Sequence, residues 1–269
     1  MQGRVLIVAG SDSGGGAGIQ ADIKATSALG AYAATAITAL TAQNTTGVQA
    51  VMPVPPDFLQ RQLRSVISDI GADCVKTGML HDAPVIEAVC DVLESDIPSV
   101  PVVVDPVMVA KGGDALLVAG AVATLKARMV PGAAILTPNV PEAEALTGLT
   151  IATLDDMRRA AASLIEAGAD AALIKGGHLD GPVVRDLLMT GAGEEQVFEN
   201  RRIDTRHTHG TGCTLASAIA AGIAQGMTPV AAVGRAEAYL HEAIRTAPGI
   251  GAGHGPVGHM HTVVPFEFD

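Results

Sequence analysis

The chain has 269 residues, 48% of them hydrophobic and 2% aromatic, and its 17 basic and 28 acidic residues give a formal net charge of −11. This length and apolar content suit one α/β domain with a sizeable core, and we expect residues 1–269 to form a single domain because no linker, repeat or low-complexity tract interrupts them. An acidic chain without basic runs is a poor nucleic-acid binder, and no apolar stretch approaches the twenty residues of a membrane span. The N-terminus also lacks a basic region followed by an apolar one, so we expect a cytoplasmic protein.

Short apolar runs alternate with helical patterns along the chain. We expect strands at 5–9, 35–40, 74–77, 102–104, 134–137 and 171–174. We expect helices at 19–29, 56–69, 83–94, 119–128, 154–167, 212–225 and 229–245. Strands that are apolar throughout and alternate with amphipathic helices indicate a mainly parallel sheet covered on both faces. Residues 183–203, with the turn TGAG at 190–193, predict a β-hairpin at one edge of that sheet.

Polar or glycine residues follow nearly every predicted strand. They are, in chain order, GSD at 10–12, AQN at 42–44, KTGM at 76–79, DPVM at 105–108, TPNVPE at 137–142 and KGGH at 175–178. The carboxyl ends of parallel strands meet at one edge of a sheet, where ligands bind in open α/β folds. We therefore expect these groups to converge on one active site.

The turn HGTGC at 209–213 leads directly into a run of small residues that reads as a helix. Glycines let the backbone N–H groups of Gly210, Thr211, Gly212 and Cys213 approach a ligand, and the helix N-terminus adds partial positive charge. This predicts an anion site, with the Cys213 thiol where a phosphoryl group is bound or transferred.

Several of these features have structural explanations as well. The glycines at 10–18 can form only a tight turn, and they are not a Walker A loop because the chain has no Gly-Lys-Ser/Thr. Asp105 before a proline can initiate a turn, and Asn139 with Glu142 can form a helix capping box. Cys74 and Cys90 are expected in the core. The histidines resemble zinc ligands in two groups, His207 and His209 with Cys213, and His254, His259 and His261, but the glycines between them fit anion binding better.

The sequence resembles the hydroxymethylpyrimidine/phosphomethylpyrimidine kinases of thiamine biosynthesis, a family of the ribokinase-like superfamily. The motifs that carry the resemblance are AGSDS at 9–13, GGAGIQAD at 15–22, TALTAQNT at 38–45, KTGML at 76–80, DPVM at 105–108, TPN at 137–139, PEA at 141–143, KGGH at 175–178 and HGTGCT at 209–214. They extend over essentially the whole chain. The resemblance implies a three-layer α/β sandwich, a homodimer, and the use of ATP with Mg²⁺. Gly14 departs from the family, which usually has Ser or Pro there.

The implied reaction has two steps. ATP phosphorylates the hydroxymethyl group of 4-amino-5-hydroxymethyl-2-methylpyrimidine, and the monophosphate is then phosphorylated to the diphosphate. By resemblance, the pyrimidine is bound by Gln43, Gly10, Asp12, Asp22, Met79 and Val107. Asp105 and Glu142 orient Mg²⁺, partly through water. Lys175, Asn139, Thr211 and Gly212 contact ATP, and the backbone of Gly210 to Cys213 stabilises the γ-phosphoryl group in transit.

Cys213 stands where most ribokinase-like kinases have an aspartate base. We hypothesise that it accepts the proton of the attacking hydroxyl at least in the first step, since a helix N-terminus can lower a thiol pKa, although bound ATP opposes this. Three alternatives stay open at this point: a vitamin B6 kinase acting on pyridoxal or pyridoxine, a non-catalytic binding protein on the same fold, and a covalent cysteine transferase with His209 near the thiol.

Overall fold

The computed structural model describes residues 2–109, 116–118, 120–265 and 267. Within these residues a nine-stranded sheet has the order β3-β2-β1-β4-β5-β6-β7-β8-β9. Strands β2, β1, β4, β5, β6 and β7 are parallel to their neighbours, whereas β3, at one edge, and β8 and β9, at the other, join by antiparallel pairing. The strands are β1 (Arg4–Ser11), β2 (Tyr32–Asn44), β3 (Gly47–Pro53), β4 (Cys74–Thr77), β5 (Val102–Val104), β6 (Ile135–Leu136), β7 (Ala171–Lys175), β8 (Val183–Thr190) and β9 (Glu195–Arg201).

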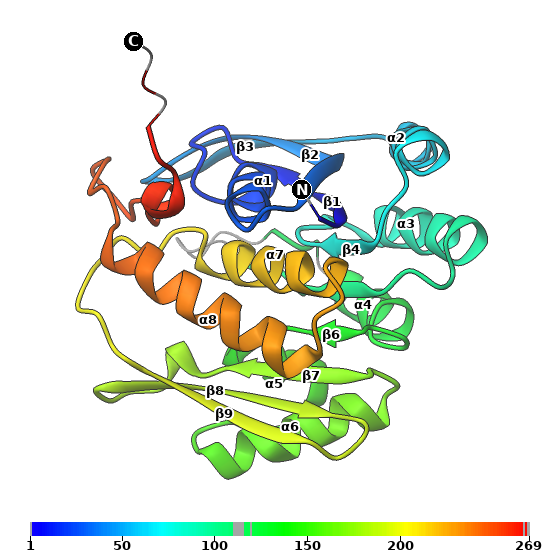
Figure 1. The fold of residues 1–269 in the computed structure, drawn as a ribbon. Helices are drawn as coiled ribbons and strands as arrows, with labels where there is room; N and C mark the ends of the chain where they lie inside the picture. Colours follow the sequence, from blue (N-terminus) through cyan, green and yellow to red (C-terminus); the bar gives the residue numbers. More distant parts are fainter. Residues whose placement is uncertain (1, 110–115, 119, 266, 268–269) are drawn as a thin grey trace.

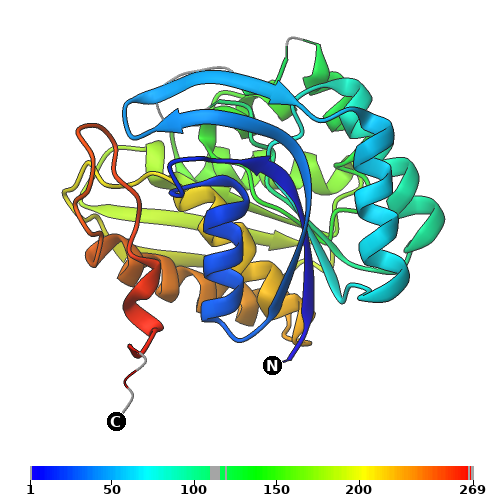
Figure 2. The same cartoon turned by 90° about the horizontal axis from the view of Figure 1, so that it is seen from above.

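Helices cover both faces of the sheet, which gives three layers (Figures 1 and 2). One face carries α2 (Pro56–Asp69), α3 (Ala83–Asp96), α4 (Ala121–Arg128), α5 (Val140–Thr147) and α6 (Leu154–Glu166). The other face carries α1 (Gly18–Ala28), α7 (Thr211–Ala224) and α8 (Pro229–Arg245). The short 3-10 helices η1 (Gly176–His178) and η2 (His259–Thr262) complete the elements described. The fold is the expected ribokinase-like sandwich.

Strand β1 shows how one strand fills two cores. Val5 and Ile7 belong to the core on the side of α1, α7 and α8, whereas Leu6 and Val8 belong to the core on the side of α2 to α6. All four are fully buried. Successive side chains of a strand point to opposite faces, so a strand that is apolar at every position must be covered on both sides.

Most predicted elements are confirmed to within a few residues. The hairpin of β8 and β9 lies at the sheet edge as predicted, and α5 begins with the predicted capping box between Asn139 and Glu142. The helix predicted to start at residue 119 starts at Ala121, and residue 119 itself lies outside the described residues. None of the helices in the described ranges is long and apolar enough to cross a membrane.

Strand β3 was not predicted. It pairs antiparallel with β2, which itself continues to Asn44 instead of ending at residue 40. Every residue of β3 is exposed or half-buried, so it shows no alternation of apolar and polar positions. The periodicity that reveals a strand in a sequence comes from a buried face, and an edge strand without one gives no such signal.

Candidate active site

The first turn of α7 is an open anion site. Gly210 precedes the helix with φ +81°, and a Cβ there would collide with the carbonyl oxygen of Gly16, so only glycine fits. No side chain caps this helix end. The N–H groups of Gly212 and Cys213 lie in the first turn, where they have no partner within the helix and can receive an anion, whereas that of Thr211 donates to the carbonyl of Thr208 at 3.4 Å.

Lys175 and Asp105 face this helix end from the sheet. A Cβ on Gly212 would lie 3.4 Å from Lys175 Nζ and 3.5 Å from Asp105 Oδ2. Lys175 ends β7 and donates from Nζ to Asp105 Oδ1 at 3.0 Å, while Asp105 follows β5 and is 2% exposed. Burial lowers the pKa of Lys175, but Asp105 and Glu142 raise it more, so the ammonium stays charged. A cation and free amides therefore surround one space.

Glu142 provides a second carboxylate close to Asp105. Its Oε2 accepts from the backbone N–H of Asn139 at 2.8 Å, and Asn139 Oδ1 accepts from the N–H of Glu142 at 2.9 Å. Burial is the main cause that raises the pKa of Glu142; Lys175 lowers this pKa and Asp105 raises it. Two buried carboxylates that repel each other beside one lysine form a group that a divalent cation would stabilise.

Asp12 organises the glycine-rich loop after β1. Its carboxylate accepts from the N–H groups of Gly14 (2.8 Å), Gly16 (3.1 Å) and Ala17 (2.8 Å), and His209 Nε2 lies 2.9 Å from Oδ2. Burial raises the pKa of Asp12, but the hydrogen bonds from His209, Ala17 and Gly14 lower it by more, so the pKa is below its ordinary value. Asp12 is 3% exposed. It therefore holds the loop and His209 in place in this structure, and its expected place at the pyrimidine pocket stays a prediction.

The other residues expected near the pyrimidine lie at the same end of the sheet. Gln43 is half-buried on β2; its Nε2 is 3.3 Å from His209 Nε2 and its Oε1 is 3.2 Å from Thr41 Oγ1. A Cβ on Gly10 would lie 3.0 Å from Met79 Sδ, so Gly10 and Met79 are neighbours. Val107 is half-buried two residues after Asp105. His209 thus connects Gln43 with the anion loop.

Asp22 forms a buried ion pair. Its side chain is fully buried in α1, where Oδ1 accepts from Lys76 Nζ at 2.8 Å and from Ser217 Oγ at 2.7 Å. The side chain has no exposed surface in this structure, and its expected contact with the pyrimidine stays a prediction. Sequence analysis named Lys76 only within KTGM and did not pair it with Asp22 or Ser217; a lysine inside the apolar strand β4 is the signal that could have found the pair.

Cys213 is a neutral thiol in this structure. Burial is the largest cause that raises its pKa, to about 12; Lys76 lowers the pKa, and Asp22 and Asp105 raise it. The backbone N–H of Gly18, at the start of α1, also bonds to the thiol. We expected the helix N-terminus to lower this pKa, but burial and the two carboxylates outweigh it.

The two histidine groups that resemble zinc ligands are not brought together as such among the described residues. In the described ranges no three His, Cys, Asp or Glu side chains are grouped so that they could hold a metal ion. His259 Nε2 lies 2.9 Å from Thr214 Oγ1, and burial lowers the pKa of His259 to about 4, which leaves the ring neutral. His254 and His261 bond to backbone oxygens of Arg206 and Gly258.

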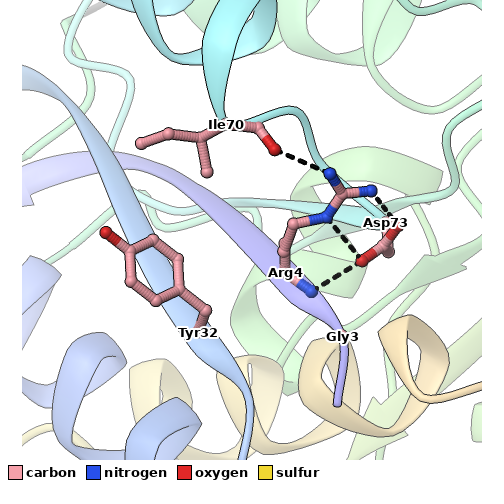
Figure 3. Close-up of a pocket in the computed structure, with 5 residues that line it drawn as sticks. All are labelled: Gly3, Arg4, Tyr32, Ile70 and Asp73. Carbon is pink, nitrogen blue, oxygen red and sulfur yellow. Dashed lines mark hydrogen bonds and ion pairs between the residues drawn. The ribbon is translucent and has the colours of Figure 1, made fainter. Parts of the chain in front are cut away.

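A surface hollow of about 390 Å³ lies at the other end of the sheet (Figure 3). Arg4 starts β1, Tyr32 starts β2 and Asp73 precedes β4, so the hollow is at the amino ends of the strands. The Arg4 guanidinium is already bound to Asp73 and to the carbonyl of Ile70. In parallel sheets ligands bind at the carboxyl ends, and we therefore assign the functional site to the polar groups there.

Comparisons with known proteins identify the family of this chain. Residues 12–258 match the family model of phosphomethylpyrimidine kinase. The hydroxymethylpyrimidine/phosphomethylpyrimidine kinase of Streptomyces coelicolor is 49% identical over 95% of this chain and 93% of its own length, and that of Bacillus subtilis is 48% identical over 96% and 94%. The chain is also 52% identical to the thiamine biosynthesis bifunctional protein ThiED of Geobacter sulfurreducens, of which it spans only about half (52%).

Solved structures of kinases share the fold. The pyridoxal kinase of Staphylococcus aureus in complex with pyridoxal superposes with a TM-score of 0.88 at 35% identity, covering 96% of this chain and 94% of that one. The phosphomethylpyrimidine kinase of Clostridium difficile 630 superposes with a TM-score of 0.80 at 41% identity, covering 90% and 99%. The family model spans most of the chain, and full-length relatives share nearly half of its residues. This chain belongs to the phosphomethylpyrimidine kinase family.

Proposed function

We propose that the protein uses ATP to phosphorylate 4-amino-5-hydroxymethyl-2-methylpyrimidine and then phosphorylates the monophosphate to the diphosphate. The observation that carries this proposal is the position of Lys175 and Asp105 against Gly212 at the open end of α7. A lysine, free helix amides and carboxylates around one space suit the transfer of a phosphoryl group, which needs charge stabilisation more than covalent chemistry. The names of the relatives support the same reaction.

The phosphate end of the site is formed by the backbone of Gly210 to Cys213 and by Lys175. Free N–H groups of the first turn would bind the oxygens of the γ-phosphoryl group, and the helix dipole favours the negative charge that spreads over them. Lys175 is 13% exposed, so its ammonium can leave Asp105 and neutralise a phosphate. Thr211, Gly212 and Asn139 would complete the contacts to ATP.

Asp105 and Glu142 fit a magnesium ion. They are two carboxylates and not a complete cage, which agrees with the preference of Mg²⁺ for a few carboxylates together with waters and substrate phosphates. When bound, the ion neutralises phosphate charge. Glu142 already uses Oε2 to cap α5, so its contact to the ion is best made through water.

The pyrimidine would lie between Gln43, Gly10, Met79 and Val107. An amide offers both a donor and an acceptor to the edge of an aminopyrimidine, and Met79 and Val107 give the ring apolar contact. The Cys213 thiol, on the first turn of α7, is then close to the hydroxyl that attacks. Whether it removes the proton is a separate question, because its pKa is raised.

Pyridoxal is the second candidate substrate. Its support is the TM-score of 0.88 to a pyridoxal kinase that holds pyridoxal, higher than the 0.80 to a phosphomethylpyrimidine kinase. Sequence identity ranks the two the other way, at 35% against 41% for these structures and 48–49% for the curated pyrimidine kinases. Identity reflects the side chains that contact a substrate more directly than backbone superposition does, so the pyrimidine is favoured.

We also propose a cytoplasmic homodimer. The three cysteines are free, as is usual for proteins of the reducing cytoplasm, and the cytoplasm supplies ATP. Leu40 and Met52 face each other across β2 and β3 and are 45% and 67% exposed, and β3 is an edge strand. An apolar pair on an edge strand suits contact with a second copy. Sedimentation equilibrium would show a dimer that Met52→Glu weakens; a wild-type monomer would contradict this.

The decisive experiment is an assay with ATP, Mg²⁺ and the pyrimidine alcohol, with mass spectrometry to separate monophosphate from diphosphate. We expect both products, and a kcat/KM for the pyrimidine at least ten times that for pyridoxal. Arg4→Gln, in the hollow at the far end of the sheet, is the matched control and should leave kcat/KM unchanged. A larger kcat/KM for pyridoxal would make the protein a vitamin B6 kinase, and the absence of ATP-dependent product would favour a binding protein.

A further inference from the structure

Two buried carboxyl groups meet behind the Lys175 turn. Asp186 on β8 and Glu237 on α8 are each 6% exposed, and their carboxyl groups are close enough for each to shift the pKa of the other. In Figure 1, α8 crosses the sheet near its β7 to β9 edge, and it packs against β9, the neighbour of β8. Neither residue contacts Asp105 or Glu142 in any hydrogen bond or ion pair of the described residues, so the pair is separate from the proposed magnesium site.

A hydrogen bond between two carboxyl groups requires that one of them holds a proton. Asp186 Oδ1 accepts from the backbone N–H of Gly176 at 2.7 Å, which favours an ionised Asp186. Glu237 Oε2 accepts from Asn200 Nδ2 at 3.0 Å, and no N–H or O–H group of the described residues donates to its buried Oε1. If Glu237 Oε1 carries a proton and donates it to Asp186, both carboxyl oxygens of Glu237 have a hydrogen-bond partner.

The electrostatic surroundings agree with this assignment. Burial raises the pKa of both carboxyl groups; the bond between them raises the pKa of Glu237 further and lowers that of Asp186. The groups that face the pair are the N–H of Gly176 after β7, Asn200 on β9 and the more distant charge of Lys175, which lowers both pKa values. No other charged group contributes to either of them.

Asp186 binds the peptide bond that joins Lys175 to Gly176. The other side of Lys175 is held by its own N–H, which donates to the carbonyl of Pro138 at 2.9 Å. Gly176 packs so closely that a Cβ would collide with the carbonyl oxygen of Arg185. Arg202 donates to the carbonyls of Gly177 and Gly181, which fixes the rest of the turn. The direction in which Lys175 leaves β7 is thus set by Asp186.

We propose that a protonated Glu237 and an ionised Asp186 form a proton-sharing pair that positions the Lys175–Gly176 peptide, and with it the lysine ammonium, for phosphoryl transfer. Glu237 and Asp186 are positioning residues and do not touch the substrates. The kinetic part of this inference rests on the proposed function; the proton on Glu237 does not.

The first test measures stability against pH. The folded state holds a proton on Glu237 that the unfolded chain releases at the ordinary carboxyl pKa, so this residue's contribution to stability is present at low pH and is lost as the pH rises through neutrality. Glu237→Gln keeps a donor to Asp186 and an acceptor for Asn200 without a proton to lose. We expect the ratio of unfolding constants, wild type over Glu237→Gln, to rise about tenfold per pH unit from pH 5.5 to 7.5.

Glu242→Gln is the matched control. Glu242 lies on the same helix, has a side chain that is 38% exposed and pairs with Arg245, and its pKa is lowered by that pair. Its unfolding curve should follow that of the wild type at neutral pH. Parallel curves for wild type and Glu237→Gln across the whole range would overturn the proton assignment, whether or not the protein is a kinase.

The second test measures kinetics. Glu237→Gln should keep kcat within about twofold of wild type, because the bond to Asp186 is preserved. Glu237→Leu removes it, and we expect kcat to fall at least tenfold with little change in KM for the pyrimidine. If Glu237→Leu does not fold, Glu237→Met with chemical denaturation as a folding check replaces it. Full activity of a folded Glu237→Leu or Glu237→Met would refute the positioning role, and absence of activity in the wild type would refute the proposed function alone.

Discussion

Two lysine–aspartate pairs lie at the carboxyl ends of parallel strands, and they differ in access to solvent. Lys76 and Asp22 are both 0% exposed at a separation of 2.8 Å, whereas Lys175 and Asp105 are 13% and 2% exposed at 3.0 Å. α7 packs on β4, which carries Lys76, and the Gly212 end of α7 lies against Lys175 at the end of β7. Chemically equal pairs are thus placed at different depths under one helix.

Depth determines what each ammonium can do. Lys175 can exchange Asp105 for a phosphate oxygen, since a partly open site lets ligand replace the carboxylate. Lys76 cannot, because Asp22 and the strands enclose it. Burial lowers the pKa of Lys76, but the carboxylates of Asp22 and Asp105 raise it more, so the ammonium stays charged. The Lys76–Asp22 pair, which we call the inner pair, is a buried ion pair that stays in place near Cys213. The Lys175–Asp105 pair, which we call the outer pair, is the one that meets the substrate.

The largest effect is expected from breaking the inner pair. Lys76→Met leaves the carboxylate of Asp22 buried with only Ser217 as a donor, and removal of one partner of a buried pair costs about 3–5 kcal/mol. Chemical denaturation measures this loss. The double variant Lys76→Met with Asp22→Asn should recover most of it, because no unpaired charge remains. If the single variant is as stable as the wild type, the inner pair is not a structural charge.

Breaking the outer pair should affect activity and spare the fold. Lys175→Met removes a cation from the phosphoryl group in transit, and loss of one such stabilising group costs about 100-fold to 1,000-fold in kcat. Asp105 and Glu142 then lose their common cation, and Glu142, whose pKa is already raised, can take up a proton to relieve the repulsion. Steady-state kinetics and thermal unfolding should move independently. A large loss of stability with intact kcat would reverse the roles of the two lysines.

The sequence predicts the outer pair better than the inner one. Lys175 is followed by two glycines and Asp105 by a proline, and both stand directly after apolar runs, so their place at the sheet edge follows from topology. Lys76 is inside such a run, and its partner Asp22 is 54 residues away on a helix. Spacing along the chain cannot show that a lysine in a strand and an aspartate in a helix meet inside the core.

The chemistry of the site follows the same division. Backbone features such as the open end of α7 and the capping box of α5 are local, so short motifs predict them. The protonation of Cys213 depends on burial and on three charged groups from α1, β4 and the end of β5. No short motif includes all of these groups, so the sequence alone does not predict the protonation state. The same holds for Asp186 and Glu237, which are 51 residues apart.

The smallest of the predicted effects is the change in kcat when Cys213 is replaced. Cys213 lies near both lysine–aspartate pairs, so its pKa reports on both. Cys213→Ala should lose most of kcat while ATP still binds, if the thiol accepts the hydroxyl proton at least in the first step. Because the pKa of the thiol is about 12, the thiolate fraction rises about tenfold per pH unit through neutrality. A thiolate base therefore predicts that the ratio of kcat, wild type over Cys213→Ala, rises with that slope from pH 6.5 to 9. A ratio that is large but independent of pH means that the neutral thiol only positions the hydroxyl.

Near-normal turnover of Cys213→Ala would remove the thiol from the reaction and leave the α7 amides with Lys175. Asp22→Asn separates the contribution of the inner pair, since loss of a carboxylate that raises the thiol pKa should shift the profile of the wild-type cysteine toward lower pH and leave that of Cys213→Ala in place.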